Sequence, residues 1–373
     1  MSATLDPSHP VDVHHDDHGH MPFQAHHFDD PEQQFDAGKL GIWLFLVTEV
    51  LFFSGMFCAY ALYRSLHPEV FVFASQFLNE TLGAFNTGVL LFSSLSMAWG
   101  VRCAQMRQRT GLVVALAITL GCAAIFLGIK AVEYSHKWDM GLLVASMYVP
   151  QSTHAVEHHE GVSHWLIYFS VVPAICVAGF LVWYGLAVAK RDKPTAEIAG
   201  PFLVTALCYF VGVGIGLIFQ SYEEKAKAAE HVVAAHGVAP ADAHNVAAVE
   251  AAEAKVLAAA VADQEAHNEP AKSDRHIEAS SIASLSFQPG EPTDIEVDQK
   301  GRAGLFFSIY YCMTGVHALH IIGGMLVLGW LLIRATKNHF NEQYFGPVDY
   351  VGLYWHLVDL IWIYLFPLLY LIK

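Results

Sequence analysis

The sequence is poor in charged residues. Asp, Glu, Lys and Arg make up 15% of the 373 residues, whereas hydrophobic residues make up 54%. Soluble domains usually carry about 25% charged residues, so this composition excludes an ordinary soluble enzyme. The mean hydropathy of +0.39 is also high. We therefore expect an integral membrane protein.

Cysteine is scarce, and residues 1–39 lack an apolar stretch. All six cysteines lie in or at the ends of apolar runs, which is typical of small buried hydrophobic residues, so we expect no disulfide framework. The missing apolar stretch excludes a cleaved secretory signal. Residues 1–39 are instead rich in His and Asp. These histidines could chelate a metal, but the composition favours a solvated tail.

Seven apolar stretches are long enough to cross a bilayer, which takes about 20 residues. They cover residues 40–63, 79–103, 112–135, 163–189, 199–221, 303–334 and 350–372. Backbone exposed to lipid must satisfy its own hydrogen bonds, so each stretch is expected to be a helix. The predicted fold class is an all-α integral membrane protein, a seven-transmembrane-helix bundle with an extra periplasmic helical insert.

Positive charges gather in alternate linkers between these spans. The linkers after the second, fourth and sixth spans contain Arg102, Arg107, Arg109, Lys190, Arg191, Lys193, Arg334 and Lys337. The opposite short loops offer only Arg64 and Lys137. Because positive charge marks the cytoplasmic side, we expect a cytoplasmic N-terminus and a periplasmic C-terminus.

The chain divides into five segments by composition. They are a His/Asp-rich cytoplasmic tail (1–39), three spans (40–139), a transmembrane hairpin (140–221), an acidic Ala-rich periplasmic insert (222–302) and two final spans (303–373). Ala and Glu favour helix, so the insert is expected to form one or two exposed helices. The tail and the insert are both acidic, which excludes a nucleic-acid partner.

One carboxylate, Glu49, interrupts the apolar run "LFLVTEVLFFSGMF". An acid at the centre of a spanning helix costs about 2.5 to 3.5 kcal/mol on insertion scales, so it needs a partner, a bound proton or a task. Pairing with a histidine, a proton-linked role and burial alone all stay open at this point.

Histidines of the sixth span lie at a similar depth to Glu49. Glu49 lies about 14 Å from the cytoplasmic start of its span, and His320 lies about 21 Å from Arg334 at the inner end of the sixth span. Both depths fall in the middle third of a hydrocarbon core of about 30 Å. We therefore predict an intramembrane proton or hydrogen-bond site formed by Glu49, His320 and His317. Metal or haem ligation by this histidine pair is an alternative with weak support.

The seventh span adds two polar residues at the same level. The stretch "YWHLVDLIW" places His356 and Asp359 three residues apart, and Asp359 lies about 14 Å from the inner end of its helix. We expect these residues to share a layer with Glu49 and to be able to pair there. No metal site is predicted.

Five motifs now point to a family. They are "LGIWLFLVTEVLFFSGMFCAY", "FNTGVLLFSSLSMAW", "LAITLGCAAIFLGIKAVEY", "YYCMTGVHALHIIGGMLVLGWLLIR" and "YWHLVDLIWIYLFPLLYL". In this order they resemble subunit III of the haem–copper oxidases, of the cytochrome c oxidase type.

The resemblance implies a non-catalytic subunit III of a bacterial aa3-type cytochrome c oxidase in the inner membrane. Such a subunit stabilises the catalytic subunit, binds phospholipid and supports proton uptake. Haem and copper would lie in partner subunits, with none bound directly by this chain. Subunit I would be the main contact and subunit II a further partner, and the acidic insert could dock cytochrome c or a supercomplex component. An accessory subunit of a quinol oxidase or nitric oxide reductase, and an independent proton-coupled transporter, stay open as alternatives.

The resemblance also assigns residues. Glu49 matches the family's intramembrane glutamate, His320 the histidine facing it, and His317 the other member of that motif. Arg334 and His356 are expected to bind lipid. Structural positions are matched by Asn86, Thr87, Trp99, Glu133, Tyr134, Trp355 and Asp359.

Two departures from the family pattern bear on these assignments. Family members usually have two helices before the glutamate helix, whereas here only a polar tail precedes it and a hairpin is inserted later. That hairpin, or another subunit, would have to supply the second wall of the family's lipid cleft. Lys130 stands where the family usually has a neutral, glutamine-like residue, and we expect it to snorkel toward the periplasmic end.

Overall fold

The chain folds as a bundle of long helices. The computed structural model describes residues 28–144, 163–236, 294–341 and 344–372. Within these ranges seven helices are long and apolar enough to cross a membrane. The same ranges contain no strand, and only an isolated bridge joins Asn341 and Tyr344. The prediction of an all-helical, seven-span protein is confirmed.

The helix bounds follow the predicted spans with local differences. The elements are α1 (Pro31–Leu66), α2 (Pro68–Ser75), α3 (Glu80–Gln105), α4 (Arg109–Asp139), α5 (His164–Ala189), α6 (Lys193–His236), α8 (Asp294–Thr336), α9 (Gly346–Phe366) and a π-helical turn at Pro367–Leu371. Helix α1 begins before residue 40 because the Asp30 side chain accepts from the Gln33 backbone N–H and Pro31 opens the first turn. The eight-residue α2 was not predicted.

Two polar segments are described only in part. Helix α6 continues past residue 221, and α8 begins before residue 303, so both borders of the predicted acidic insert are helical. The centre of that insert and most of the histidine-rich tail lie outside the described residues. The five-segment division stays a prediction.

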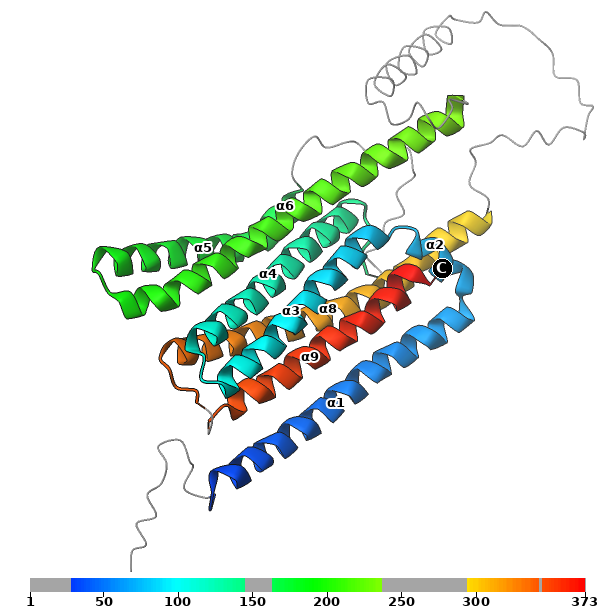
Figure 1. Ribbon diagram of the computed structural model, residues 1–373. Coiled ribbons are helices and arrows are strands. Elements are labelled where there is room, and N and C mark those ends of the chain that lie inside the picture. The colour runs from blue at the N-terminus through cyan, green and yellow to red at the C-terminus, as the bar shows by residue number, and fades with distance from the viewer. Residues whose placement is uncertain (1–27, 145–162, 237–293, 342–343, 373) are drawn as a thin grey trace, which may run out of the picture.

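Helix α4 is the centre of the bundle, and α1 and α5 are its margins (Figure 1). In the most apolar stretch of α4, 67% of the residues are buried inside the chain, compared with 11% for α1 and 6% for α5. The apolar outer faces of α1 and α5 are therefore left for lipid or for other polypeptides.

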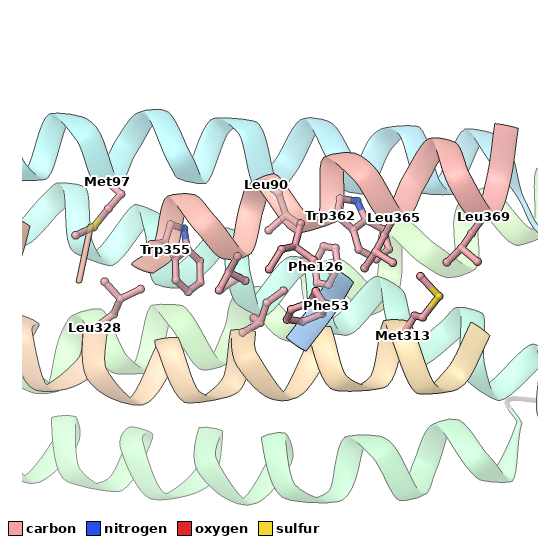
Figure 2. Packing of buried hydrophobic residues seen from close by; sticks show 14 of the residues in the cluster. Phe53, Leu90, Met97, Phe126, Met313, Leu328, Trp355, Trp362, Leu365 and Leu369 are labelled. Carbon is pink, nitrogen blue, oxygen red and sulfur yellow. The ribbon is translucent and has the colours of Figure 1, made fainter. Parts of the chain in front are cut away.

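The core is built on two tryptophans of α9, Trp355 and Trp362, which are both fully buried. Figure 2 shows Trp362 beside Leu90 of α3, Phe126 of α4 and Phe53 of α1, and Trp355 farther along α9. The rings of Phe126 and Trp362 meet edge to face at 4.8 Å, a geometry that aromatic quadrupoles favour. Spaced seven residues apart, the tryptophans lie on one face of α9 and fix it against the bundle.

The inserted hairpin, α5 and α6, is attached to α4 by close glycine packing. A Cβ on Gly128 of α4 would lie 2.2 Å from the Tyr209 carbonyl oxygen, and one on Gly212 of α6 would lie 2.3 Å from the Ile125 oxygen. Small residues that let two backbones approach are typical of tight helix pairs in membranes. The hairpin is thus an integral part of the bundle.

The predicted positive linkers meet at one end of the bundle (Figure 1). The Arg109 guanidinium at the start of α4 donates to Glu197 of α6 at 2.5 Å and to the Thr336 carbonyl of α8 at 2.6 Å. These bonds join the three helical turns that carry the positive charges. All three turns therefore lie at the same membrane surface.

Candidate functional site: a carboxyl–imidazole pair at the edge of the bundle

Glu49 of α1 meets His320 of α8. The Oε2 atom of Glu49 lies 2.9 Å from Nε2 of His320, and the two side chains are 17% and 22% exposed. The next residues on α1, Val50 and Leu51, point outward with 48% and 66% exposure. The pair therefore lies at the boundary between the bundle and its surroundings, outside the aromatic core.

Hydrogen counting shows that this pair shares one proton. Nδ1 of His320 lies 2.8 Å from the Val316 carbonyl oxygen, and because a carbonyl oxygen only accepts, Nδ1 must carry a hydrogen. Nε2 then either accepts from a protonated Glu49 or, as part of an imidazolium, donates to the ionised carboxylate. Both arrangements place a single proton between Glu49 and His320.

Neighbouring groups hold the imidazole in place. The ring of Phe53 packs edge-on against His320 at a centroid distance of 5.2 Å, and that of Phe52 lies at 6.3 Å. The Tyr354 hydroxyl of α9 donates to the His320 backbone carbonyl at 2.9 Å. The phenylalanine rings pack against the imidazole, and the Tyr354 bond holds the backbone that carries it.

His317 does not belong to this pair, so its predicted place in the site is wrong. Its side chain is fully buried and lies against Trp362 at 5.2 Å and Phe126 at 5.8 Å. Neither ring nitrogen has a hydrogen-bond partner among the described residues. Each residue turns a helix by about 100°, so residues three apart point in directions that differ by about 60°. Helix α1 contacts α8 on the side that carries His320.

The expected layer of pairing groups is also wrong for the seventh span. Asp359 contacts the Ser93 hydroxyl at 3.3 Å, and Nδ1 of His356 lies 2.6 Å from the Ser94 hydroxyl. Both contacts face α3, away from Glu49. The expected depth of these residues in the membrane put them at one level. Depth does not determine which neighbouring helix each side chain faces.

Arg334 and His356, the two predicted lipid ligands, lie at different levels. Arg334 is in the last turn of α8, where its Nε donates to His339 Nδ1 at 3.3 Å and its guanidinium lies 4.9 Å from the Trp330 ring. His356 lies about 15 Å along α9 from the helix start. A single phosphate cannot reach both side chains.

Two of the predicted structural residues, Thr87 and Trp355, form hydrogen bonds that join α3 and α9. The indole of Trp355 donates to the Ser93 hydroxyl at 3.1 Å, and that of Trp362 donates to the Thr87 hydroxyl at 3.0 Å. Polar groups on α3 thus satisfy both buried indole N–H groups.

Three further predicted structural residues have different environments. Asn86 is buried, and the Tyr134 hydroxyl lies 2.6 Å from that of Thr314 on α8. Trp99, by contrast, is 67% exposed on the outer face of α3. Most of its surface is left uncovered by the described part of the chain.

Glu133 is the centre of a buried charge cluster that was not predicted from the sequence. Its carboxylate accepts from Lys130 at 2.8 Å, Lys137 at 2.5 Å, Tyr310 at 2.7 Å and Tyr370 at 2.5 Å. All three charged side chains are almost fully buried. The prediction that Lys130 snorkels is wrong, and Lys137, assigned to a loop, lies inside α4.

A signal for this cluster was present in the sequence. Lys130, Glu133 and Lys137 lie at positions i, i+3 and i+7, which share one helix face. An acid between two lysines on one apolar helix predicts an internal ion pair, because a lone buried charge is costly. The tyrosines come from α8 and the final π-helical turn, and the pattern within α4 does not indicate them.

The part of the chain that the structure describes has no cluster of metal-binding side chains. In residues 28–144, 163–236, 294–341 and 344–372, no three His, Cys, Asp or Glu side chains are grouped to hold a metal ion. The six cysteines are free thiols. The tail histidines lie outside these ranges.

Two stretches, residues 23–138 and 300–373, match the family model described as cytochrome c oxidase subunit III. Together they make up just over half of the chain. The chain belongs to the cytochrome c oxidase subunit III family. The interval between the matched stretches contains α5 and α6, so the hairpin is an insertion relative to the family.

Curated relatives of subunit III match shorter parts of the chain. Cytochrome c oxidase subunit 3 of Thermostichus vulcanus is 43% identical over 72 residues, or 19% of this chain and 36% of that protein. The corresponding protein of Synechocystis sp. is 41% identical over 69 residues, or 18% and 30%. A haem–copper oxidase subunit I+III of Aeropyrum pernix is 39% identical over 71 residues, or 19% and 9%. The chain thus matches at most about a third of the length of these relatives.

Proposed function

We propose that this chain is the non-catalytic subunit III of a bacterial aa3-type cytochrome c oxidase. The Glu49–His320 pair carries the proposal, because it is a one-proton site at the edge of a bundle that belongs to the subunit III family. In this role the chain stabilises the catalytic subunit of an oxygen-reducing complex and does no redox chemistry of its own.

Subunit I is the proposed main partner, with subunit II as a further contact. The Aeropyrum pernix relative carries subunits I and III in one polypeptide, which supports close packing of the two. Haem and copper are proposed to be held by these partners. The turns joined by Arg109 carry the positive linkers and are proposed to face the cytoplasm, with the C-terminus in the periplasm.

Phospholipid is the proposed ligand of the outer surface beside α1. Arg334 lies at the predicted cytoplasmic end with an exposed aromatic neighbour, Trp330, a combination suited to a lipid headgroup. The inserted hairpin packs on α4 and lies away from α1 in Figure 1. We therefore propose that another polypeptide, and not this hairpin, covers α1 and encloses the lipid.

Proton uptake is the proposed task of Glu49. A carboxyl that shares one proton with an imidazole at the bundle edge can take up or release that proton with little rearrangement. The acidic insert at residues 222–302 is proposed to attract a basic cytochrome c or a supercomplex component, since opposite charges steer association.

Purification of the complex through a tag on this chain tests the proposal. We expect haem-bearing subunits to copurify, and the chain separated from them to show no Soret absorbance. Haem absorbance from the isolated chain contradicts the non-catalytic role. Proton-driven solute uptake by the isolated chain in liposomes would indicate a transporter instead.

A further inference from the structure

Asp359 is a buried carboxyl group without a charged partner. It lies at the contact of α9 with α3 and is 2% exposed. Its Oδ2 atom lies 3.3 Å from the Ser93 hydroxyl, and its Oδ1 atom has no hydrogen-bond partner among the described residues. None of the ion pairs within the described part of the chain involves Asp359. An ionised carboxylate in this position would be a buried, uncompensated charge.

The hydrogen bonds of Ser93 determine which group donates to which. Its Oγ atom lies 2.8 Å from the Leu90 carbonyl oxygen, 3.1 Å from Trp355 Nε1 and 3.3 Å from Asp359 Oδ2. A hydroxyl has one hydrogen and two lone pairs. The hydrogen goes to Leu90, the shortest contact and one that can only accept. With its hydrogen on Leu90, Ser93 accepts from the Trp355 N–H and has a second lone pair that can accept a hydrogen from a protonated Asp359.

We propose that Asp359 is a protonated carboxylic acid and forms a second proton-binding site in this protein. The carboxylate takes up one proton, and the resulting O–H on Oδ2 donates to Ser93. Oδ1 becomes a carbonyl oxygen, for which a buried water is the natural donor. This inference does not depend on the oxidase role.

The groups around Asp359 are compatible with a neutral acid. Ser94 also lies near the carboxyl, but its 2.6 Å contact is with Nδ1 of His356. On α4 the titratable group near Asp359 is the Cys122 thiol. The α8 histidine, His317, faces Trp362 instead. No lysine or arginine among the described residues pairs with Asp359 to hold it ionised.

The site is separate from the Glu49–His320 pair. Glu49 pairs with an imidazole between α1 and α8, whereas Asp359 contacts a hydroxyl between α9 and α3. Glu49 is partly exposed and Asp359 is buried. The second site is therefore suited to keeping its proton, and the first to exchanging it.

Infrared spectroscopy of the purified complex, compared in H₂O and D₂O, tests the proposal. We expect wild-type protein to show a carbonyl band of a protonated carboxylic acid that is lost in Asp359→Asn and kept in Glu49→Gln. Asparagine can donate its amide N–H to Ser93, so this variant should assemble. An Asp359→Asn spectrum that loses a carboxylate band, with no change in the carboxylic acid region, overturns the proposal.

Ser93→Ala provides a second test that does not depend on Asp359→Asn assembling. Without the Ser93 acceptor, the Asp359 O–H loses its partner, and we expect its carbonyl band to shift in frequency. Ser135→Ala is the matched control, because the buried Ser135 hydroxyl bonds to the Val132 carbonyl of its own helix, and it should leave the band in place. An unchanged carboxylic acid region in Ser93→Ala contradicts the proposed donation.

Discussion

The contact between Glu49 and His320 shows how an acid can be kept in an apolar helix. The imidazole directs Nδ1 to a carbonyl of its own helix and Nε2 to the carboxyl, so one proton satisfies both side chains. Opposite charges or a neutral pair both fit this geometry. The two cases differ in whether a charge remains on His320 when Glu49 is replaced.

Glu49→Gln distinguishes these cases. If the pair is neutral, the glutamine amide can donate to Nε2, and we expect the thermal midpoint of the complex to fall only slightly, since a neutral hydrogen bond contributes about 1 kcal/mol. Glu49→Leu should cost about 1–3 kcal/mol because Nε2 then lacks a partner. Thermal unfolding and subunit retention in detergent measure both effects.

The matched control for this pair of variants is Glu69→Gln, at an exposed position of α2. It should leave the thermal midpoint and subunit retention unchanged. If Glu49→Gln is as damaging as Glu49→Leu, the pair is ionic, because a lone charge then remains on His320.

Glu133→Gln is expected to be far more destabilising than Lys130→Gln. Removing the carboxylate leaves two buried ammonium groups without a counter-charge, which costs about 3–5 kcal/mol. Removing Lys130 leaves Glu133 with Lys137 and two tyrosines. Thermal unfolding of the two variants tests this order.

The double variant Lys130→Gln/Glu133→Gln provides the control for this cluster. It should recover part of the stability lost in Glu133→Gln, because residues in one network do not act additively. A double variant whose loss equals the sum of the two single losses would show that the two residues do not interact.

Residue contacts could be predicted from the sequence only where a buried polar residue needed a partner at its own depth. Glu49 needed a polar partner at its own depth, and His320 was within reach. His317, His356 and Asp359 were expected at the same level as Glu49, but their neighbours depend on how each helix is rotated, which an almost wholly apolar surface does not reveal. The Glu133 cluster was missed because its lysines were taken to be surface residues.

At the scale of elements, the α4–α6 contact explains how an insertion becomes part of the bundle. Gly128 and Gly212 bring the two backbones together, and a Cβ on Gly216 would lie only 3.0 Å from the side chain of Val132. Lipid tails are as apolar as the helix surfaces, so the hydrophobic effect does not favour a packed hairpin over one exposed to lipid. The close fit of the two helices therefore stabilises the contact.

Gly212→Ala should loosen the inserted hairpin. The added methyl group would overlap the Ile125 backbone, and such overpacking costs about 1–3 kcal/mol. We expect a lower thermal midpoint and faster protease cleavage of the chain in detergent. Gly214→Ala on the same helix is the control, because a Cβ there meets no atom within 4 Å. Equal effects of the two substitutions contradict a close α4–α6 contact.

Span positions could be predicted because length and hydropathy alone decide whether a helix crosses a bilayer. The short α2 was missed, since eight residues carry no such signal. The place of α5 and α6 could not be predicted either, because both helices are apolar and the close approach of Gly128 and Gly212 depends on the three-dimensional register.

At the scale of the whole molecule, the insertion preserves the direction of the last two spans. Two added spans return the chain to the side from which it left, so α8 still runs antiparallel to α1 and brings His320 to Glu49. The sequence predicted this because an even number of spans leaves the later helices in their original direction. It did not show that the hairpin would occupy the α4 side, away from α1.

Replacing residues 237–293 with a short Gly/Ser linker tests the proposed role of the acidic insert. The seven spans lie outside this segment, so we expect the complex to assemble. Oxidation of a basic cytochrome c should slow at low ionic strength and match wild type at high ionic strength, because salt screens the steering. Unchanged kinetics at low salt would remove the docking proposal.

A density map of the intact complex, purified through a tag on this chain, tests the central claim most directly. We predict a haem-bearing subunit packed against the bundle, the Glu49 carboxyl within hydrogen-bond distance of His320 Nε2, and lipid or a partner helix against the outer face of α1. A map with Glu49 and His320 on separate sides of the bundle, or with haem held by this chain itself, contradicts the account.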